Sequence, residues 1–380
     1  MIPIWQRRAA ALLIAAMLII TADRACACAV PVFRYALERW LPDPYDAIVF
    51  HRGPLAKDDA AAVASLCERA ASRQAPANVA VRTVDLAAGP PADLAALFLS
   101  LGTKELPCIA LRYPAGAAFN GAVWCGRLSR ETVQTVADSP LRRELARRLM
   151  GGDSAVWVLL ESGNAAKDNA AAAILTARLG KLQQTMKLPE MDGPSESPDA
   201  ESGVQSSVPL KIAFSLLRIP RRNTAEEILR GMLIHSENDL LNYPDEPIAF
   251  PVYGRGRILY SLVGKGICPE NIREACDFLV GSCSCQAKMD NPGTDLLISA
   301  NWAGAIDHEL AVDKALPPLT GVMPLPPDGK TTGAAQAPIT SSPRAFLVRV
   351  AAAIAIAVVA AAIGTAILLV RRSRARRRQR

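Results

Sequence analysis

The stretch DAIVFHRGPLAKDDAAA (46–62) indicates the fold, because it joins a short apolar run to an alanine-rich segment through a glycine. A second stretch of the same kind, WVLLESGNAAKDNAAA, occupies residues 157–172. Apolar runs of about 4–8 residues bounded by turn residues favour buried strands, and alanine-rich segments favour helices. The chain therefore contains one strand-to-helix junction twice, which predicts two related α/β units.

The residues after the first junction continue as alternating strands and helices. Residues 78–86 alternate in polarity and are rich in β-branched side chains, which predicts a strand. Residues 91–102 begin with proline and end with glycine, as helices often do. Two further strands, 105–114 and 122–128, and a helix over 129–139 complete the predicted unit.

The second half repeats this order. Its predicted strands and helices cover residues 154–163, 165–186, 210–219, 224–240, 247–266 and 270–281. Thr224 and Glu227 form the T-x-x-E pattern of a helix capping box. Pro251 falls inside a predicted strand, and because proline cannot donate a ladder hydrogen bond, it indicates a bulge or an edge.

The order of elements resembles the thioredoxin fold, and the most specific stretches are LGTKELPCIALRYP (101–114) and AVWCGRLSRETVQTVAD (122–138). In that family a cis-proline opens the third strand and borders the active site, so the resemblance implies this role for Pro107 and Pro247. The expected fold class is α/β: two thioredoxin-like domains, each a central mixed sheet flanked by helices, plus one C-terminal transmembrane helix. The two domains are expected over 31–150 and 153–310.

The two junctions lack the family's reactive motif. Redox-active thioredoxins carry C-x-x-C where the first strand meets its helix, because the helix N-terminus lowers the pKa of the leading thiol. The corresponding stretches here, HRGPLAK (51–57) and ESGNAAK (161–167), contain no cysteine. The sequence therefore argues against dithiol exchange at either junction. It indicates no cofactor, and it favours a binding protein over an enzyme.

Both ends of the chain suggest export and membrane attachment. Residues 1–27 have a basic start, a 12-residue apolar run and small residues near the end, which predicts a signal peptide. Residues 350–370 carry no charge, which predicts a transmembrane helix over 347–370. The arginine-rich tail, 371–380, is expected in the cytoplasm. The predicted location is the bacterial cytoplasmic membrane, with the larger part of the chain in the periplasm or outside.

The distribution of charge argues against a nucleic-acid partner. The tail holds seven arginines, as many charges as the formal net charge of +7 of the 380-residue chain, so the rest is close to neutral.

Two segments have the composition of chain without a packed core. Residues 189–207 are rich in Pro, Ser, Asp and Glu, which predicts a disordered insertion. Residues 314–344 are rich in Pro, Gly and Thr, which predicts a stalk-like linker.

Nine cysteines remain to be explained, and six of them are candidates for a disulfide or a redox site: Cys108, Cys125, Cys268, Cys276, Cys283 and Cys285. Cys108 and Cys125 lie on adjacent predicted strands and fit either a buried pair or free thiols. The last four form a cluster for which three interpretations stay open. They can form structural disulfides, a redox-active C-x-C at Cys283 and Cys285, or a soft-metal site.

Two functions from different classes fit these observations. The first is a redox-inactive protein-interaction or scaffold module, bound to protein partners at the outer face of the membrane and to the bilayer through one span. The second is an envelope thiol–disulfide or soft-metal-handling protein that uses Cys283 and Cys285.

Overall fold

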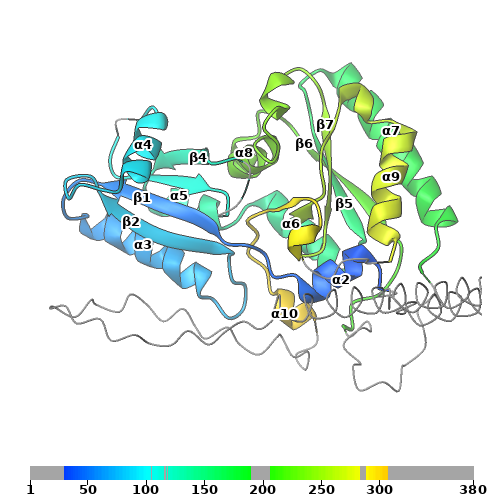
Figure 1. The fold of residues 1–380 in the computed structure, drawn as a ribbon, viewed down its shortest axis with the longest axis horizontal. Coiled ribbons are helices and arrows are strands. Elements are labelled where there is room, and N and C mark those ends of the chain that lie inside the picture. The colour runs from blue at the N-terminus through cyan, green and yellow to red at the C-terminus, as the bar shows by residue number, and fades with distance from the viewer. Residues whose placement is uncertain are drawn as a thin grey trace, which may run out of the picture. The chain divides into compact units, whose positions relative to one another are not determined.

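The computed structural model describes residues 30–103, 105–114, 117, 119–189, 206–282 and 288–306, which form two mixed β-sheets with helices (Figure 1). Each sheet begins at one of the two repeated junctions. The apolar run of the junction becomes the central strand and is fully buried, and the alanine-rich segment becomes the helix that follows. The periodicity of the sequence therefore identifies the centre of each sheet correctly.

The first sheet has four strands in the order β2-β1-β3-β4. Its strands are β1 (Tyr45–His51), β2 (Val79–Asp85), β3 (Cys108–Arg112) and β4 (Ala122–Arg127). β1 and β2 run parallel, whereas β1–β3 and β3–β4 are antiparallel. The helices that alternate with these strands are α3 (Lys57–Ala70), α4 (Ala92–Ser100), α5 (Arg130–Ala137) and α6 (Pro140–Met150).

The second sheet has the strand path β10-β8-β7-β5-β6, with β9 also paired to β7. Its strands are β5 (Ala155–Leu160), β6 (Phe214–Ile219), β7 (Ile248–Tyr253), β8 (Arg257–Ile258), β9 (Leu262–Val263) and β10 (Thr294–Asp295). The pair β5–β6 is parallel and β5–β7 is antiparallel, so the directions match those of the first sheet. The main helices are α7 (Ala165–Thr185), α8 (Glu227–Ile234) and α9 (Pro269–Val280).

The two sheets also agree in register around the predicted prolines. Phe50 pairs with Cys108, and Leu160 pairs with Ile248, so Pro107 and Pro247 each precede an equivalent residue. The Leu106–Pro107 bond is cis, and among the described residues it is the only cis bond, so the prediction of a cis bond at Pro247 is wrong. The bond before Pro247 is trans, the form that X-Pro bonds intrinsically favour.

Pro251 explains why the chain that returns alongside β7 forms two short strands, β8 and β9, instead of one long strand. It lies in the middle of β7, opposite Trp157 of β5, and its carbonyl accepts a hydrogen bond from Leu259 N at 3.0 Å. The missing N–H faces the same side of β7 as this carbonyl, because both groups of a strand residue point one way. The returning chain therefore breaks into β8 and β9, which agrees with the bulge or edge that the sequence indicated.

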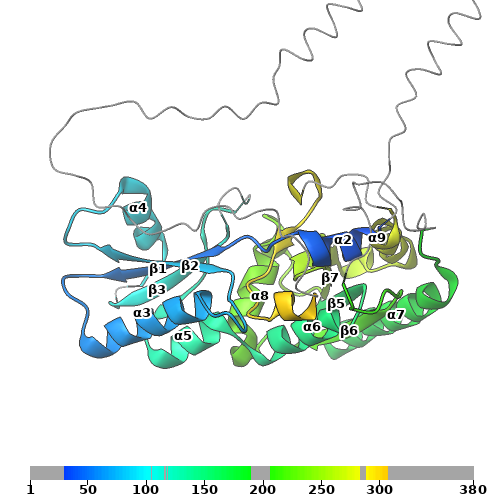
Figure 2. The ribbon, with the colours of Figure 1, turned by 90° about the horizontal axis from the view of Figure 1, so that it is seen from below.

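The first helix among the described residues packs on the second sheet, although it precedes the first sheet in the chain. This helix, α2 (Val32–Arg39), shares a buried cluster with β5, α7 and α9 (Figures 1 and 2). Arg255, in the turn between β7 and β8, donates to the carbonyls of Leu37 at 2.8 Å and Glu38 at 3.0 Å. The glycine–arginine turn at 254–257 therefore anchors this helix, because an arginine satisfies carbonyls at its C-terminal end.

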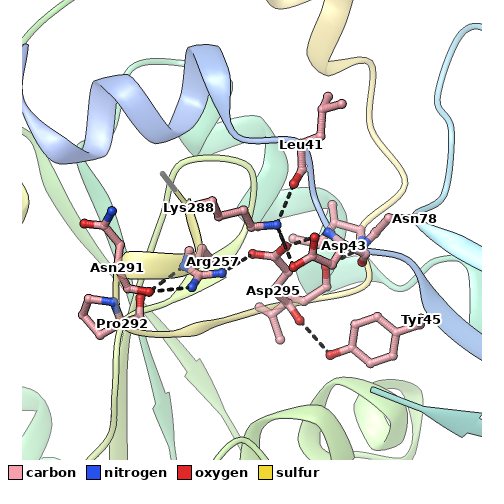
Figure 3. A network of polar contacts seen from close by, with 11 residues as sticks. Leu41, Asp43, Tyr45, Asn78, Arg257, Lys288, Asn291, Pro292 and Asp295 are labelled. Atoms are coloured by element: carbon pink, nitrogen blue, oxygen red, sulfur yellow. Dashed lines mark hydrogen bonds and ion pairs between the residues drawn. The ribbon is translucent and has the colours of Figure 1, made fainter. Parts of the chain in front are cut away.

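A buried ionic network joins the end of the second sheet to the first (Figure 3). Asp295 accepts hydrogen bonds from Arg257 Nη1 at 3.1 Å and from the backbone N of Asp43 at 2.7 Å, and it contacts Lys288 Nζ. Tyr45 donates its hydroxyl to the Asp295 carbonyl at 2.8 Å. Because Asp295 is only 4% exposed and paired with two cations, its charge is compensated inside the protein.

One hydrophobic cluster contains residues of both sheets, so the two halves share a core. The two backbones approach each other closely where α8 lies on β4. A Cβ placed on Gly231 would come within 2.4 Å of the Val123 carbonyl oxygen, which only glycine avoids. Tyr113 of the first half also donates its hydroxyl to the Met232 carbonyl.

The helix predicted over 224–240 differs in detail. Thr224–Glu226 form a 3₁₀ turn, the α-helix covers only Glu227–Ile234, and a second 3₁₀ turn covers Leu240–Asn242. The predicted capping box does not form, because Asn223 caps instead: its Oδ1 accepts from Ala225 N at 3.0 Å. Asparagine before the turn competes well for this role, since it is among the strongest N-cap residues.

The fold-class prediction needs a correction, since it counted a transmembrane helix as an element of the fold. The described fold is α/β with two mixed sheets, and none of its helices is long and apolar enough to cross a membrane. α7 reaches 21 residues but carries charges such as Lys167, Asp168 and Arg178, which a membrane-spanning helix avoids. The predicted signal peptide, most of the insertion (190–205), the linker 314–344, residues 347–370 and the tail lie outside the described residues.

Candidate functional site

The junction between β5 and α7 is held in one conformation by a buried carboxylate. Asp168, 3% exposed, accepts hydrogen bonds from Ser162 N at 2.7 Å, Ser162 Oγ at 2.8 Å and Gly163 N at 3.1 Å. Gly163 has φ of +93°, a left-handed value that favours glycine. Asn164 caps α7 by accepting from Ala166 N and Lys167 N. The loop is therefore rigid, and its side chains include no thiol.

A groove of about 930 Å³ lies beside this junction and beside Pro247. Its lining comes from four segments: the first turns of α7, the loop 237–247, β9 with the turn after it, and the start of α9. Its volume falls within the range of about 300–1,000 Å³ that is usual for ligand sites. The groove is therefore large enough to hold several side chains of a bound partner.

The surface of the groove carries exposed apolar side chains. Ile174 of α7 is 38% exposed and Tyr243 is 40% exposed, and both line the groove. Leu241, next to the lining residues Leu240 and Tyr243, is 56% exposed. Large apolar side chains gathered in the open around a groove mark sites where proteins contact partners.

Charged groups flank these apolar residues. Lys167 Nζ lies 2.6 Å from Glu246 Oε1 and donates to the Asp245 carbonyl at 3.0 Å. Glu237 accepts a hydrogen bond from Ser261 N at 2.6 Å, at the start of the segment that leads into β9. The lining thus combines an apolar surface with polar groups held in fixed positions, the combination that orients a ligand.

The backbone on either side of Pro247 is already used by the protein. Arg221 Nη2 donates to the Glu246 carbonyl at 3.0 Å, and Gly264 N donates to the Pro247 carbonyl at 2.8 Å. The equivalent proline of the first sheet, Pro107, has its carbonyl bonded to Leu128 N at 3.0 Å. The carbonyls of Glu246 and Pro247 therefore already have hydrogen-bond donors within the protein, and a partner in the groove must rely mainly on side-chain contacts.

The five cysteines that the structure describes are all free thiols, including four of the six candidates. Burial, with a smaller effect of Cys125, raises the pKa of Cys108 to about 11, and burial followed by the nearby Glu227 raises the pKa of Cys125. Burial, with Asp277, raises the pKa of Cys276 to about 12. Thiols that keep their protons at neutral pH are weak nucleophiles.

Cys268 differs from the other described candidates, because it lines the groove at the N-cap of α9. It is not bonded to Cys276, which is buried on the same helix. Cys283 and Cys285 lie outside the described residues, so the redox and metal interpretations of the C-x-C stay predictions. Among the residues that the structure describes, no group of three or more His, Cys, Asp or Glu side chains is placed to hold a metal ion.

Sequence reasoning missed the side chains that give the groove its character. Ile174 stands in an alanine-rich helix, and Leu240 and Tyr243 stand in the loop HSENDLLNYPDEP (235–247). The available signal was the presence of two leucines and a tyrosine within an otherwise polar, acidic loop. The candidate Pro247 does lie in the groove, whereas Cys108 and Cys125 lie in the first sheet.

No protein-family model, curated protein or solved structure matches the chain.

Proposed function

We propose that the chain is a protein-binding module built from two redox-inactive thioredoxin-like units, and that the groove beside Pro247 binds a peptide segment of a partner protein. The observation that carries this proposal is the position and character of the groove. It opens at the β5–α7 junction, where the resemblance implies the family's reactive site, and it carries the exposed side chains of Ile174 and Tyr243 in place of a thiol pair.

The physical chemistry of the groove favours a peptide with apolar side chains. Burying an exposed apolar surface is the main favourable contribution to association, at about 25 cal/mol per Å². The rigid junction at Asp168 adds to this, because a surface that is already ordered loses little entropy on binding. Polar groups at the rim, such as Glu246 and Lys265, would fix the direction of the peptide.

We also propose that the module acts outside the cytoplasm, at the outer face of a bacterial cytoplasmic membrane. The basic and then apolar segment at residues 1–27 supports this location. Mass spectrometry of the N-terminus of the cellular protein tests it. A mature chain that begins near residue 28 is expected, and an intact N-terminal segment would contradict export.

The binding proposal is tested with random peptides displayed on phage and selected on the full-length chain. Selected peptides, made synthetically, are expected to bind wild-type protein and to bind Ile174→Asp and Tyr243→Ala about tenfold more weakly, since central apolar anchors dominate such interfaces. Leu99→Asp is the matched control, because Leu99 is 79% exposed on α4 of the other sheet.

The protein's own thiols provide a second measurement. A bound peptide should slow alkylation of Cys268, which lines the groove, and should leave alkylation of the exposed Cys67 on α3 unchanged. Peptides that bind the groove variants as tightly as wild type, or that fail to protect Cys268, would place the binding site elsewhere and refute the proposal.

A further inference from the structure

β2 is one of the two edge strands of the first sheet. Tyr45 N donates to Asn78 O at 2.9 Å, and Leu86 N donates to His51 O at 2.9 Å. These two bonds show that the even-numbered residues of β2 point their N–H and C=O groups at β1. Since the direction of these groups alternates along a strand, Val81 and Thr83 point theirs away from the sheet.

The corresponding edge of the second sheet is covered by side chains. β6 occupies the place of β2, and Glu161 N donates to Ile219 O at 2.9 Å, so the even-numbered residues of β6 face outward. Gln183 accepts the outward N–H of Phe214 at 2.5 Å, and Arg148 Nη1 donates to the outward carbonyl of Leu216 at 3.0 Å.

No such cover protects β2. The described residues form no hydrogen bond to the outward backbone groups of Val81 and Thr83. Ala80, Arg82 and Thr83 are exposed in the seven-residue strand. A long edge with unpaired backbone groups is a template for another strand. The difference between two otherwise matched sheets therefore marks β2 as an interaction surface.

We propose that β2 pairs antiparallel with β2 of a second copy of this chain, about a two-fold axis that passes through Val81. In this register Val81 faces Val81 of the second copy, Val79 faces Thr83, and Ala80 faces Arg82. Val79 takes part through its carbonyl, because its N–H already donates to Ala77 O at 2.8 Å. The pairs Val81–Val81 and Val79–Thr83 both place two β-branched side chains opposite each other, which is a favourable combination across strands. The strand fits itself, as a two-fold interface requires.

Charge supports this register over the neighbouring one. A two-fold axis through Arg82 would place two arginines directly opposite each other, which is destabilising. In the register through Val81, each arginine faces an alanine. Arg82 also contacts Asp46 on β1 within its own chain, but this pair is exposed, so Arg82 keeps enough charge to act on a residue placed opposite it.

Sedimentation velocity of the full-length chain over a range of micromolar concentrations tests the proposal. Wild-type protein is expected to form a dimer. Ala80→Lys places a cation opposite Arg82 of the second copy, twice per dimer, and is expected to raise the dimer dissociation constant about tenfold. Ala80→Glu, at the same exposed position, is the matched control and should keep the dimer or tighten it.

Two further variants complete the experiment. Thr83→Pro removes the N–H that would bond to the Val79 carbonyl of the second copy and is expected to give monomers, without removing a bond to β1. Leu99→Lys adds the same charge as Ala80→Lys at an exposed position on α4 and should leave the dimer unchanged. Circular dichroism checks that each variant is folded.

Two results would overturn the proposal. One is a wild-type chain that stays monomeric throughout the concentration range. The other is a folded Ala80→Lys variant that dimerises as tightly as wild type. Neither result bears on the groove beside Pro247, which lies in the second sheet, so failure here leaves the proposed function to its own test.

Discussion

Single residues at close contacts carry much of the stability of this fold. Gly231 is the clearest case, because α8 approaches β4 so closely that a Cβ would lie 2.4 Å from the Val123 carbonyl oxygen. A glycine inside a helix ordinarily costs about 1 kcal/mol relative to alanine. Here the close approach of backbone to backbone explains why glycine is needed.

Gly231→Ala is therefore expected to destabilise the protein, by about 1–3 kcal/mol, as overpacking does. Gly180→Ala is the matched control, because Gly180 lies inside α7 with no atom within 4 Å of its added Cβ. That variant should gain about 0.5–1 kcal/mol from helix propensity alone. Urea unfolding measures both, and equal shifts of the same sign would contradict the packing argument.

Cys276 gives a pH-dependent prediction at the same scale. Burial raises its pKa from an ordinary 9.0 to about 12, so the folded chain holds the proton where the unfolded chain loses it. The stabilising contribution is fully present below pH 9 and is lost as the pH rises toward 12. Wild type should therefore lose more stability between neutral and alkaline pH than Cys276→Ala does, measured by urea unfolding at each pH.

Contacts between elements, rather than sheet pairing alone, connect the two halves. The segment after β10 returns to the first half, where the carbonyl of Leu297 accepts a hydrogen bond from Arg142 Nη1 at 3.2 Å and Ile298 N donates to Asn78 Oδ1 at 2.9 Å. In the other direction, α2 crosses to the second sheet. The segment after β10 therefore packs on the first half, and α2 packs on the second sheet.

The ionic network at Asp295 is the polar part of this connection (Figure 3). Asp295→Ala would leave Arg257, whose side chain is 9% exposed, buried without its carboxylate. Breaking a buried ion pair by removing one partner costs about 3–5 kcal/mol. Urea unfolding should show a loss of this size.

Asp46→Ala is the control for that experiment. It removes the partner of Arg82 from a surface pair whose side chains are 44% and 25% exposed. Exposed pairs contribute about 0–1 kcal/mol. If the two substitutions cost the same, the Asp295 network is no more important to stability than a surface pair.

We expect the described part of the chain, within residues 30–306, to unfold as one cooperative unit. The shared hydrophobic cluster draws buried residues from both sheets. Elements that share one buried core stabilise one another and tend to open together. The two sheets are therefore related in topology but dependent on each other in stability.

A chain cut to residues 153–306 is accordingly expected not to fold. It lacks α2, which packs on α9 and β7 and belongs to the buried cluster of the second sheet, and it lacks α6, which packs on β5. Circular dichroism and amide exchange should show an unfolded or fluctuating chain. Residues 30–306 are the control and should fold with one transition, whereas a stable fragment would show that the halves are independent.

The sequence alone located the two central strands and the helices that follow them. Apolar runs at 46–50 and 157–160, followed by alanine-rich segments, determine where the central strands and their helices lie, because these patterns depend on neighbouring residues. The same reasoning placed Pro107 before a central strand and indicated the break at Pro251. The absence of cysteine at both junctions is likewise a property of the sequence itself.

Only the tertiary structure decided which surfaces face solvent and which meet. Ile174 and Tyr243 come together from segments far apart in the chain, and α2 covers a sheet that starts more than a hundred residues later. Burial and partnership of this kind depend on long-range packing, which no local pattern encodes. For the same reason the free edge of β2 became visible only once β6 could be seen with Gln183 and Arg148 across its own edge.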